Sequence, residues 1–122
     1  MDIFIFPKRN ERIIIYKTMK RQAFKMYLKE GKKAEYRKRH DEIWPELEHL
    51  LREAGIREYS IFLDEETNTL FAFQQLEGDS GSQDLGKSPV VQRWWDFMAD
   101  IMEVNPDNSP VIVSLEEVFY MP

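Results

Sequence analysis

Apolar and polar residues alternate along residues 22–29, which read QAFKMYLK. Phe24, Met26 and Leu28 share one side of this alternation. A period of two is typical of a β-strand that buries one face. Gly31 follows and ends the pattern, so the sequence predicts a strand that begins near Gln22.

A helix is predicted to begin at about residues 32–34 and to break at Trp44-Pro45, because a proline disfavours helical geometry in the residue before it. Pro45 then suits the first position of a second helix. The apolar residues of this second helix recur at i, i+3, i+4 and i+7, and they are Leu47, Leu50, Leu51 and Ala54. Gly55 is placed to end that helix.

The second half of the chain predicts two strands, a helix and a closing strand. Residues 56–64 and 70–76 read as a hairpin joined by the turn EETNT. Residues 77–88 are polar and Gly-rich, which predicts a mobile connection. Ser88-Pro89 begins a helix through about Met102, and residues 111–121 read as a strand with a bulge near Glu116-Glu117.

The order β-α-β-β-α-β is the split βαβ, or ferredoxin-like, pattern. It predicts an α+β fold with a four-stranded antiparallel sheet and helices on one face. Large apolar residues occur at both odd and even positions of the strands, so that both faces of the sheet receive them. Among them are Phe24, Met26, Tyr59, Ile61, Phe71 and Phe73. The face away from the helices is therefore too apolar for a monomer in water, and we expect a homodimer whose sheets meet face to face.

The first 20 residues have no clear place in this pattern. Two apolar runs, residues 3–6 and 13–16, flank a turn-like segment at residues 7–10, and nothing fixes where either run would pair. Met19 offers an internal start. The N-terminus lacks a secretory signal, and no apolar run reaches the roughly 20 residues that span a bilayer, so we expect a cytoplasmic protein.

Composition narrows the function classes. A length of 122 residues suits one domain, and a net charge of −5 argues against a nucleic-acid binder. Cysteine is absent, which excludes disulfides and a thiol nucleophile. The two histidines would need distant carboxylates to complete a metal site, so no metal is expected.

Tyr36 and His40 are four residues apart, so they share one helix face. One interpretation is a proton-transfer pair beside an aromatic wall, because imidazole titrates near pH 6.5. The other is a half-buried histidine at the broken helix end, where its charge suits the helix dipole. The spacing alone favours the second interpretation. His49 lies off the apolar stripe of its helix and is predicted to be exposed and structural.

Trp94 and Trp95 are adjacent, and successive helical residues point about 100° apart. One indole can therefore enter the core, while the other lies at an interface, under a loop or in a pocket. Packing on the C–H face of a sugar and packing in a protein interface are equally compatible with the sequence. Carboxylate pairs are common here, and none has a spacing that singles out glycosidase chemistry. The sequence holds no phosphate-binding Gly loop and no GxSxG motif.

Several rare-residue motifs occur together and in order: EYRKRHDEIWPELEHLL, YSIFLDEETNTLFA, VQRWWDFMADIM, NPDNSPV and EEVFYMP. With these motifs, residues 19–122 resemble the L-rhamnose mutarotase family. The resemblance implies a single ferredoxin-like domain over residues 19–122, with residues 1–18 as an extension outside it. It also implies a dimeric assembly of the α/β barrel type. Residues 77–88 depart from the family, since they are Gly/Ser-rich where relatives can carry an aromatic helix.

The resemblance implies an isomerase that interconverts the α and β anomers of L-rhamnose without a cofactor. It assigns the catalytic role to His40 and sugar contacts to Tyr36, Tyr59, Trp94 and Trp95. A positioned acid–base group contributes about 10²–10⁴-fold to such a reaction, and we hypothesise that His40 is the proton donor. Its acid–base partner stays open. The alternatives are a cofactorless monooxygenase of the dimeric α+β barrel type and a non-catalytic sugar-binding module.

Overall fold

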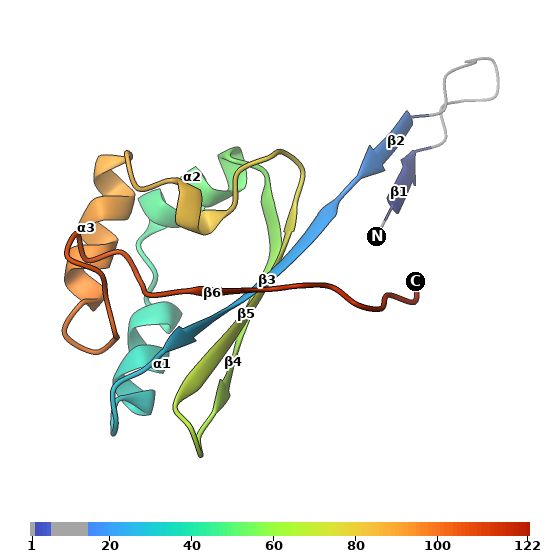
Figure 1. The fold of residues 1–122 in the computed structure, drawn as a ribbon. Helices are drawn as coiled ribbons and strands as arrows, with labels where there is room; N and C mark the ends of the chain where they lie inside the picture. Colours follow the sequence, from blue (N-terminus) through green and yellow to red (C-terminus); the bar gives the residue numbers. More distant parts are fainter. Residues whose placement is uncertain (1, 6–14) are drawn as a thin grey trace.

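A four-stranded antiparallel sheet forms the centre of the computed structural model, which describes residues 2–5 and 15–122 (Figure 1). Its strands are β3 (Lys20–Tyr27), β4 (Ile56–Asp64), β5 (Thr69–Leu76) and β6 (Val113–Leu115). They lie in the order β4-β5-β3-β6, which is the ferredoxin-like arrangement. The predicted fold class is confirmed.

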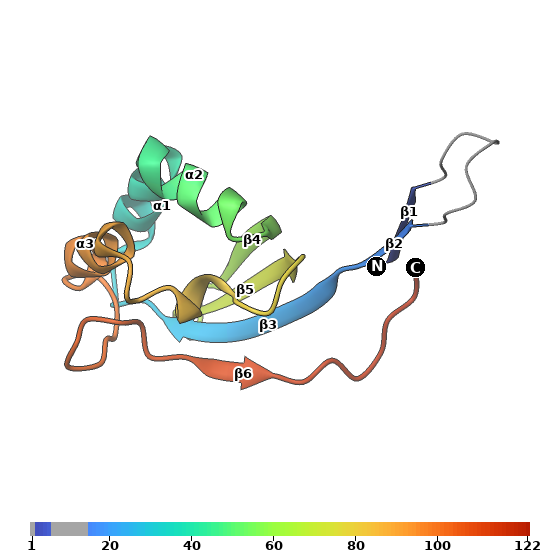
Figure 2. The same ribbon diagram turned by 90° about the horizontal axis from the view of Figure 1, so that it is seen from above.

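Three α-helices cover one face of this sheet (Figure 2). They are α1 (Lys33–Asp41), α2 (Pro45–Glu53) and α3 (Pro89–Met98), and a short 3₁₀ helix η1 (Ser82–Asp84) precedes α3. The predicted break between the first two helices is present: Trp44 is extended at φ −63° and ψ 129°, and Pro45 opens α2. Gly55 follows α2 at φ 89°, a conformation that favours glycine.

The hydrophobic core lies between the helices and the sheet. The predicted alternation in β3 holds, because Phe24, Met26 and Leu28 are all buried on the helix side. From β5, Leu70 and Ala72 join them, and they are opposite Met26 and Phe24 in the register of the sheet. The single alternating pattern of the sequence therefore places the main core of the domain.

The opposite face of the sheet carries a row of side chains that are large and apolar except for Lys25. Phe62 on β4 pairs with Phe71 on β5, which pairs with Lys25 on β3, and Lys25 pairs with Val113 on β6. Phe62 is 68% exposed in the single chain, and Phe71 and Val113 are also exposed. This row is the open apolar face that the strand pattern predicts.

Two predicted elements of the C-terminal half are shorter than expected. The helix predicted to reach Met102 ends at Met98. The closing strand covers only Val113–Leu115, opposite Lys25 to Ala23, and residues 116–122 have no regular structure. These last residues run past β3, where Glu117 bonds to Arg21 at 2.7 Å (Figure 2). The apolar pattern there predicted a strand, but β6 pairs with β3 alone along one edge of the sheet.

The described parts of the two N-terminal apolar runs pair with each other. Strands β1 (Asp2–Ile5) and β2 (Ile15–Thr18) form a separate antiparallel sheet, and β2 leads into β3 (Figure 1). The turn-like segment at residues 7–10 lies outside the described residues.

Candidate active site

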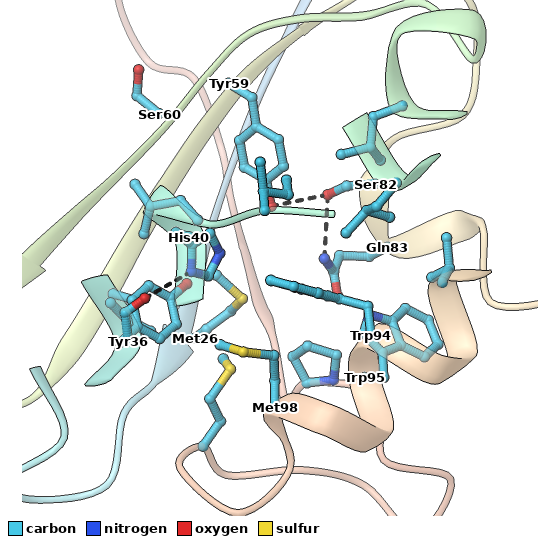
Figure 3. Close-up of a pocket in the computed structure, with 18 of the residues that line it drawn as sticks. Met26, Tyr36, His40, Tyr59, Ser60, Ser82, Gln83, Trp94, Trp95 and Met98 are labelled. Atoms are coloured by element: carbon cyan, nitrogen blue, oxygen red, sulfur yellow. Dashed lines mark hydrogen bonds between the residues drawn. The ribbon is translucent and has the colours of Figure 1, made fainter. Parts of the chain in front are cut away.

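A cavity of about 690 Å³ lies between the helices and the sheet (Figure 3). This volume is in the range of about 300–1,000 Å³ that is usual for small-molecule sites. All five residues that the sequence proposes for a site line it: Tyr36, His40, Tyr59, Trp94 and Trp95. They come from α1, β4 and α3, so the fold brings together side chains that are far apart in the sequence.

His40 lies in the last turn of α1, between two aromatic side chains. Its ring stacks on Tyr36, one turn earlier, with centroids 4.3 Å apart. The edge of Trp94 approaches it from α3, with centroids 5.5 Å apart and the rings nearly perpendicular. These contacts limit how the imidazole can rotate, and they hold it at the cavity wall.

One nitrogen of His40 is committed to the backbone. Nδ1 lies 3.1 Å from the carbonyl oxygen of Tyr36. A carbonyl oxygen only accepts, so Nδ1 carries the hydrogen and donates it. Burial lowers the pKa of His40 below its ordinary 6.5, against the opposing effects of this hydrogen bond and of Asp41. At neutral pH the imidazole is therefore uncharged, and Nε2 holds a free lone pair.

Tyr59 faces the cavity by the regular alternation of β4, which places it on the same side as Ile61 and Leu63, and all three pack against the core. A β-bulge lies beside it. The register against β5 shifts between Arg57 and Ser60, and Glu58 within the bulge has a φ of 48°. The extra residue of the bulge changes the alternation before Tyr59, so that Ile56, three residues earlier, is buried as well. On the helix side of the sheet, the Tyr59 hydroxyl accepts a 3.3 Å hydrogen bond from Ser82 Oγ (Figure 3).

Both phenols stay protonated at neutral pH. Burial raises the pKa of Tyr36, and the nearby Tyr59 adds to this shift. Burial also raises the pKa of Tyr59, while the hydrogen bond from Ser82 works in the opposite direction. Each phenol is therefore available as a hydrogen-bond donor, not as a base.

The two tryptophans occupy different surroundings, as their angular separation predicts. Trp94 contacts His40, Trp44 and Phe97, with the Trp44 ring centroid 5.1 Å away. Trp95 lies under the connection before α3, where Gly86 packs on its ring. The Trp44-Pro45 break thus has a packing role, because it places Trp44 against the indole that borders His40.

The predicted mobile connection, residues 77–88, instead forms part of the cavity wall. Ser82 is buried and Gln83 is half-buried, and both line the cavity. Gly81 and Gly86 allow close packing, since a Cβ at Gly86 would lie 2.7 Å from the Trp95 ring. The prediction failed because the Gly and Ser content that suits a mobile loop also suits a loop that packs closely. Ser82 and Gln83 are the site residues that the sequence reasoning missed.

His49 lies outside the site. Its side chain is 75% exposed, and its nearest charged partner is Glu53 on the same helix. The described part of the chain has no group of three or more His, Cys, Asp or Glu side chains arranged to hold a metal ion. None of the helices in residues 15–122 has the length and apolar character that a bilayer crossing needs.

A family model described as L-rhamnose mutarotase matches residues 21–121 of this chain. L-rhamnose mutarotases from Formosa agariphila and Bacteroides thetaiotaomicron are 65% and 67% identical to it over 103 residues, which is 84% of this chain and 99% of each relative. The crystal structure of an L-rhamnose mutarotase from Formosa agariphila superposes with a TM-score of 0.78, at 62% identity, covering 84% of this chain and 99% of that one.

Proposed function

The chain belongs to the L-rhamnose mutarotase family, and on that premise we propose that it is an isomerase that interconverts the α and β anomers of L-rhamnose. The observation that carries the proposal is a neutral imidazole with one free nitrogen, enclosed by aromatic side chains in a cavity of sugar-binding size. Mutarotation needs one proton to leave the anomeric hydroxyl and one to reach the ring oxygen, and it needs no redox step.

His40 is proposed to carry that proton. Its Nε2 removes the proton from the anomeric O1 and delivers it to the ring O5 as the C1–O5 bond breaks. O1 and O5 are bonded to the same carbon, so both lie within reach of one imidazole nitrogen. The open aldehyde turns about the C1–C2 bond, O5 attacks the other carbonyl face, and the proton returns to O1 by the same route. Because the resting imidazole is neutral, His40 acts first as a base and then as the donor, which refines the sequence-based hypothesis.

The aromatic side chains are proposed to bind the sugar. Trp94, Trp95 and Tyr36 are buried residues of the cavity wall, and flat aromatic faces suit the C–H surface of a pyranose and its 6-deoxy methyl group. Tyr59 is proposed as the partner of His40, because its protonated hydroxyl can donate a hydrogen bond to the sugar oxygen that becomes negative. In this proposal, side chains of the protein carry out both the proton transfer and the binding of the sugar.

Exchange of the two L-rhamnose anomers, followed by NMR saturation transfer between their anomeric protons, tests this function. We expect exchange well above the rate in buffer, in the presence of a chelator and without nucleotide. Oxygen uptake is measured on the same sample. Uptake without faster exchange would support the monooxygenase alternative, and sugar binding without either activity would support a binding module.

We also propose that two copies of the chain pair through the open faces of their sheets. The support is the exposed row that includes Phe62 and Phe71, together with Val118 and Phe119 in the C-terminal residues, which are 87% and 78% exposed. Several large apolar side chains exposed on one chain are unusual for a monomer, and pairing of identical surfaces is the commonest solution. We further propose residues 19–122 as the catalytic domain, residues 1–18 as an extension, and a cytoplasmic location.

A further inference from the structure

Gln74 and Ser82 are the buried polar side chains in the described part of the chain, and they bond to each other. Gln74 on β5 is 0% exposed. Its Oε1 accepts from the backbone N–H of Ser82 at 3.0 Å, and its Nε2 donates to Ser82 Oγ at 2.9 Å. Burying an amide or a hydroxyl in an apolar core is unfavourable unless the group is hydrogen-bonded. The two hydrogen bonds therefore hold Gln74 and Ser82 in a defined position relative to each other.

The donors and acceptors of this pair have a fixed direction. A backbone N–H only donates, so the end of Gln74 that faces it is the oxygen, and the other end is the NH₂ group. Ser82 Oγ accepts from this NH₂ group and, at 3.2 Å, from Gln83 Nε2. Both lone pairs of the hydroxyl are thereby used. Its own hydrogen is left to be donated, and Tyr59 Oη lies 3.3 Å away.

The direction of this last bond determines what Tyr59 can do. Its oxygen accepts from Ser82 (Figure 3). The hydrogen of the phenol is not used in this bond, so it can be donated to a ligand in the cavity that Tyr59 lines. If Ser82 could not donate, the phenol would be free to rotate and to donate to the protein instead of a ligand. The bulge in β4 aids the arrangement, because it sets Glu58 and Tyr59 opposite the single residue Gln74.

We propose that Gln74 and Ser82 are positioning residues that fix the Tyr59 hydroxyl as a hydrogen-bond donor to the sugar oxygen that becomes negative during ring opening. This inference rests on the proposed mutarotase function. The segment whose composition is typical of a mobile linker then contributes to catalysis indirectly, through the hydrogen-bond direction that it imposes on Tyr59. Burial keeps Tyr59 protonated, and the bond from Ser82 moderates the shift of its pKa.

A double-mutant cycle tests the proposal. The variants are Ser82→Ala, Tyr59→Phe and the double variant, with kcat/KM for L-rhamnose anomer exchange as the measurement. We expect Ser82→Ala to lower kcat/KM about five- to tenfold, as for the loss of one hydrogen bond. It should have no further effect once Tyr59 is Phe, because Ser82 acts through the phenol. Ser80→Ala is the matched control: the same change, two residues away and exposed, should leave kcat/KM unchanged.

Ser82→Thr keeps the hydroxyl and should retain most of the activity, which separates the role of the donated hydrogen from packing. NMR titration with ¹³C-labelled tyrosine supplies a second readout, in which Ser82→Ala should raise the pKa of Tyr59 and Ser80→Ala should not. Equal losses from Ser82→Ala in the wild-type and Tyr59→Phe backgrounds would overturn the positioning role while leaving the mutarotase function intact. An unaccelerated wild type would instead refute the proposed function itself.

Discussion

Gly86 is the position where a single methyl group should disturb the cavity most cleanly. A Cβ at Gly86 would lie 2.7 Å and 2.8 Å from two ring atoms of Trp95. Ordinary van der Waals contact begins at 3.4 Å, so the loop or the indole must move by about 0.7 Å. The indole is rigid and 7% exposed, which leaves little room for adjustment. Overpacking of this kind costs about 1–3 kcal/mol of unfolding free energy.

Gly78→Ala is the matched control, since it makes the same change in the same connection. The nearest atom to a Cβ there is the Ala54 carbonyl oxygen at 3.9 Å. With no clash, the reduced freedom of the unfolded chain should leave Gly78→Ala neutral or more stable by about 0.4–1 kcal/mol. Urea unfolding followed by tryptophan fluorescence measures both variants. Because Trp95 lines the cavity, Gly86→Ala should also raise KM for L-rhamnose more than it lowers kcat. Equal unfolding free energies for the two variants would refute the close packing of this loop on Trp95.

Four further predictions follow from the fold and the site. The kcat/KM should be level between pH 7 and 8 and should fall about tenfold per pH unit below the pKa of His40. Burial puts that pKa below 6.5. A fall in kcat/KM on the acid side that is centred above pH 6.5 would contradict this prediction. Because burial lowers the pKa of His40 in the folded chain, the unfolded chain binds a proton at His40 more readily than the folded chain does. The contribution of His40 to the free energy of unfolding should therefore decline as the pH drops below 6.5. Deletion of residues 1–18 should leave a folded, active protein by circular dichroism and anomer exchange, and an insoluble product would show that β2 supports the main sheet. Light scattering should give about twice the chain mass of 14.7 kDa, whereas a monomer at micromolar concentration would refute the pairing of the open sheet faces.

The regular part of the fold could be predicted because local patterns determine it. The alternation around Phe24 and Met26, the break before Pro45 and the glycine after α2 each have a direct backbone cause, and each is present in the structure. The C-terminal residues were predicted wrongly as a longer strand. Their apolar pattern is real, but within one chain only Val113–Leu115 pair with β3 as a strand, so the pattern alone could not give the strand length.

The candidate site could be predicted only in part. His40 and Tyr36 share a helix face, and the separate surroundings of Trp94 and Trp95 follow from helix geometry. Tyr59 alternates with Ile61 and Leu63, so the side of the sheet that it faces could be predicted, whereas its contact with Ser82 could not.

The missed Gln74–Ser82 pair did leave one signal in the sequence. Gln74 lies on the same face of its strand as Leu70, Ala72 and Leu76, which are all buried. A polar side chain on a buried strand face needs a hydrogen-bond partner that is also buried. The partner itself could not be identified from the sequence. Ser82 lies eight residues away in a segment whose composition is also typical of mobile loops.

The central claim, that His40 moves the proton during anomer exchange, is tested most directly by comparing His40→Ala with His49→Ala. The two substitutions are identical, but one removes a cavity imidazole and the other a surface imidazole whose side chain is 75% exposed. Both variants should keep the circular dichroism spectrum of the wild type. In saturation transfer between the anomeric protons of L-rhamnose, His40→Ala should lose on the order of 10²-fold or more in rate, and His49→Ala should match the wild type. A His40→Ala variant with wild-type exchange, or an inactive His49→Ala variant, would contradict the account.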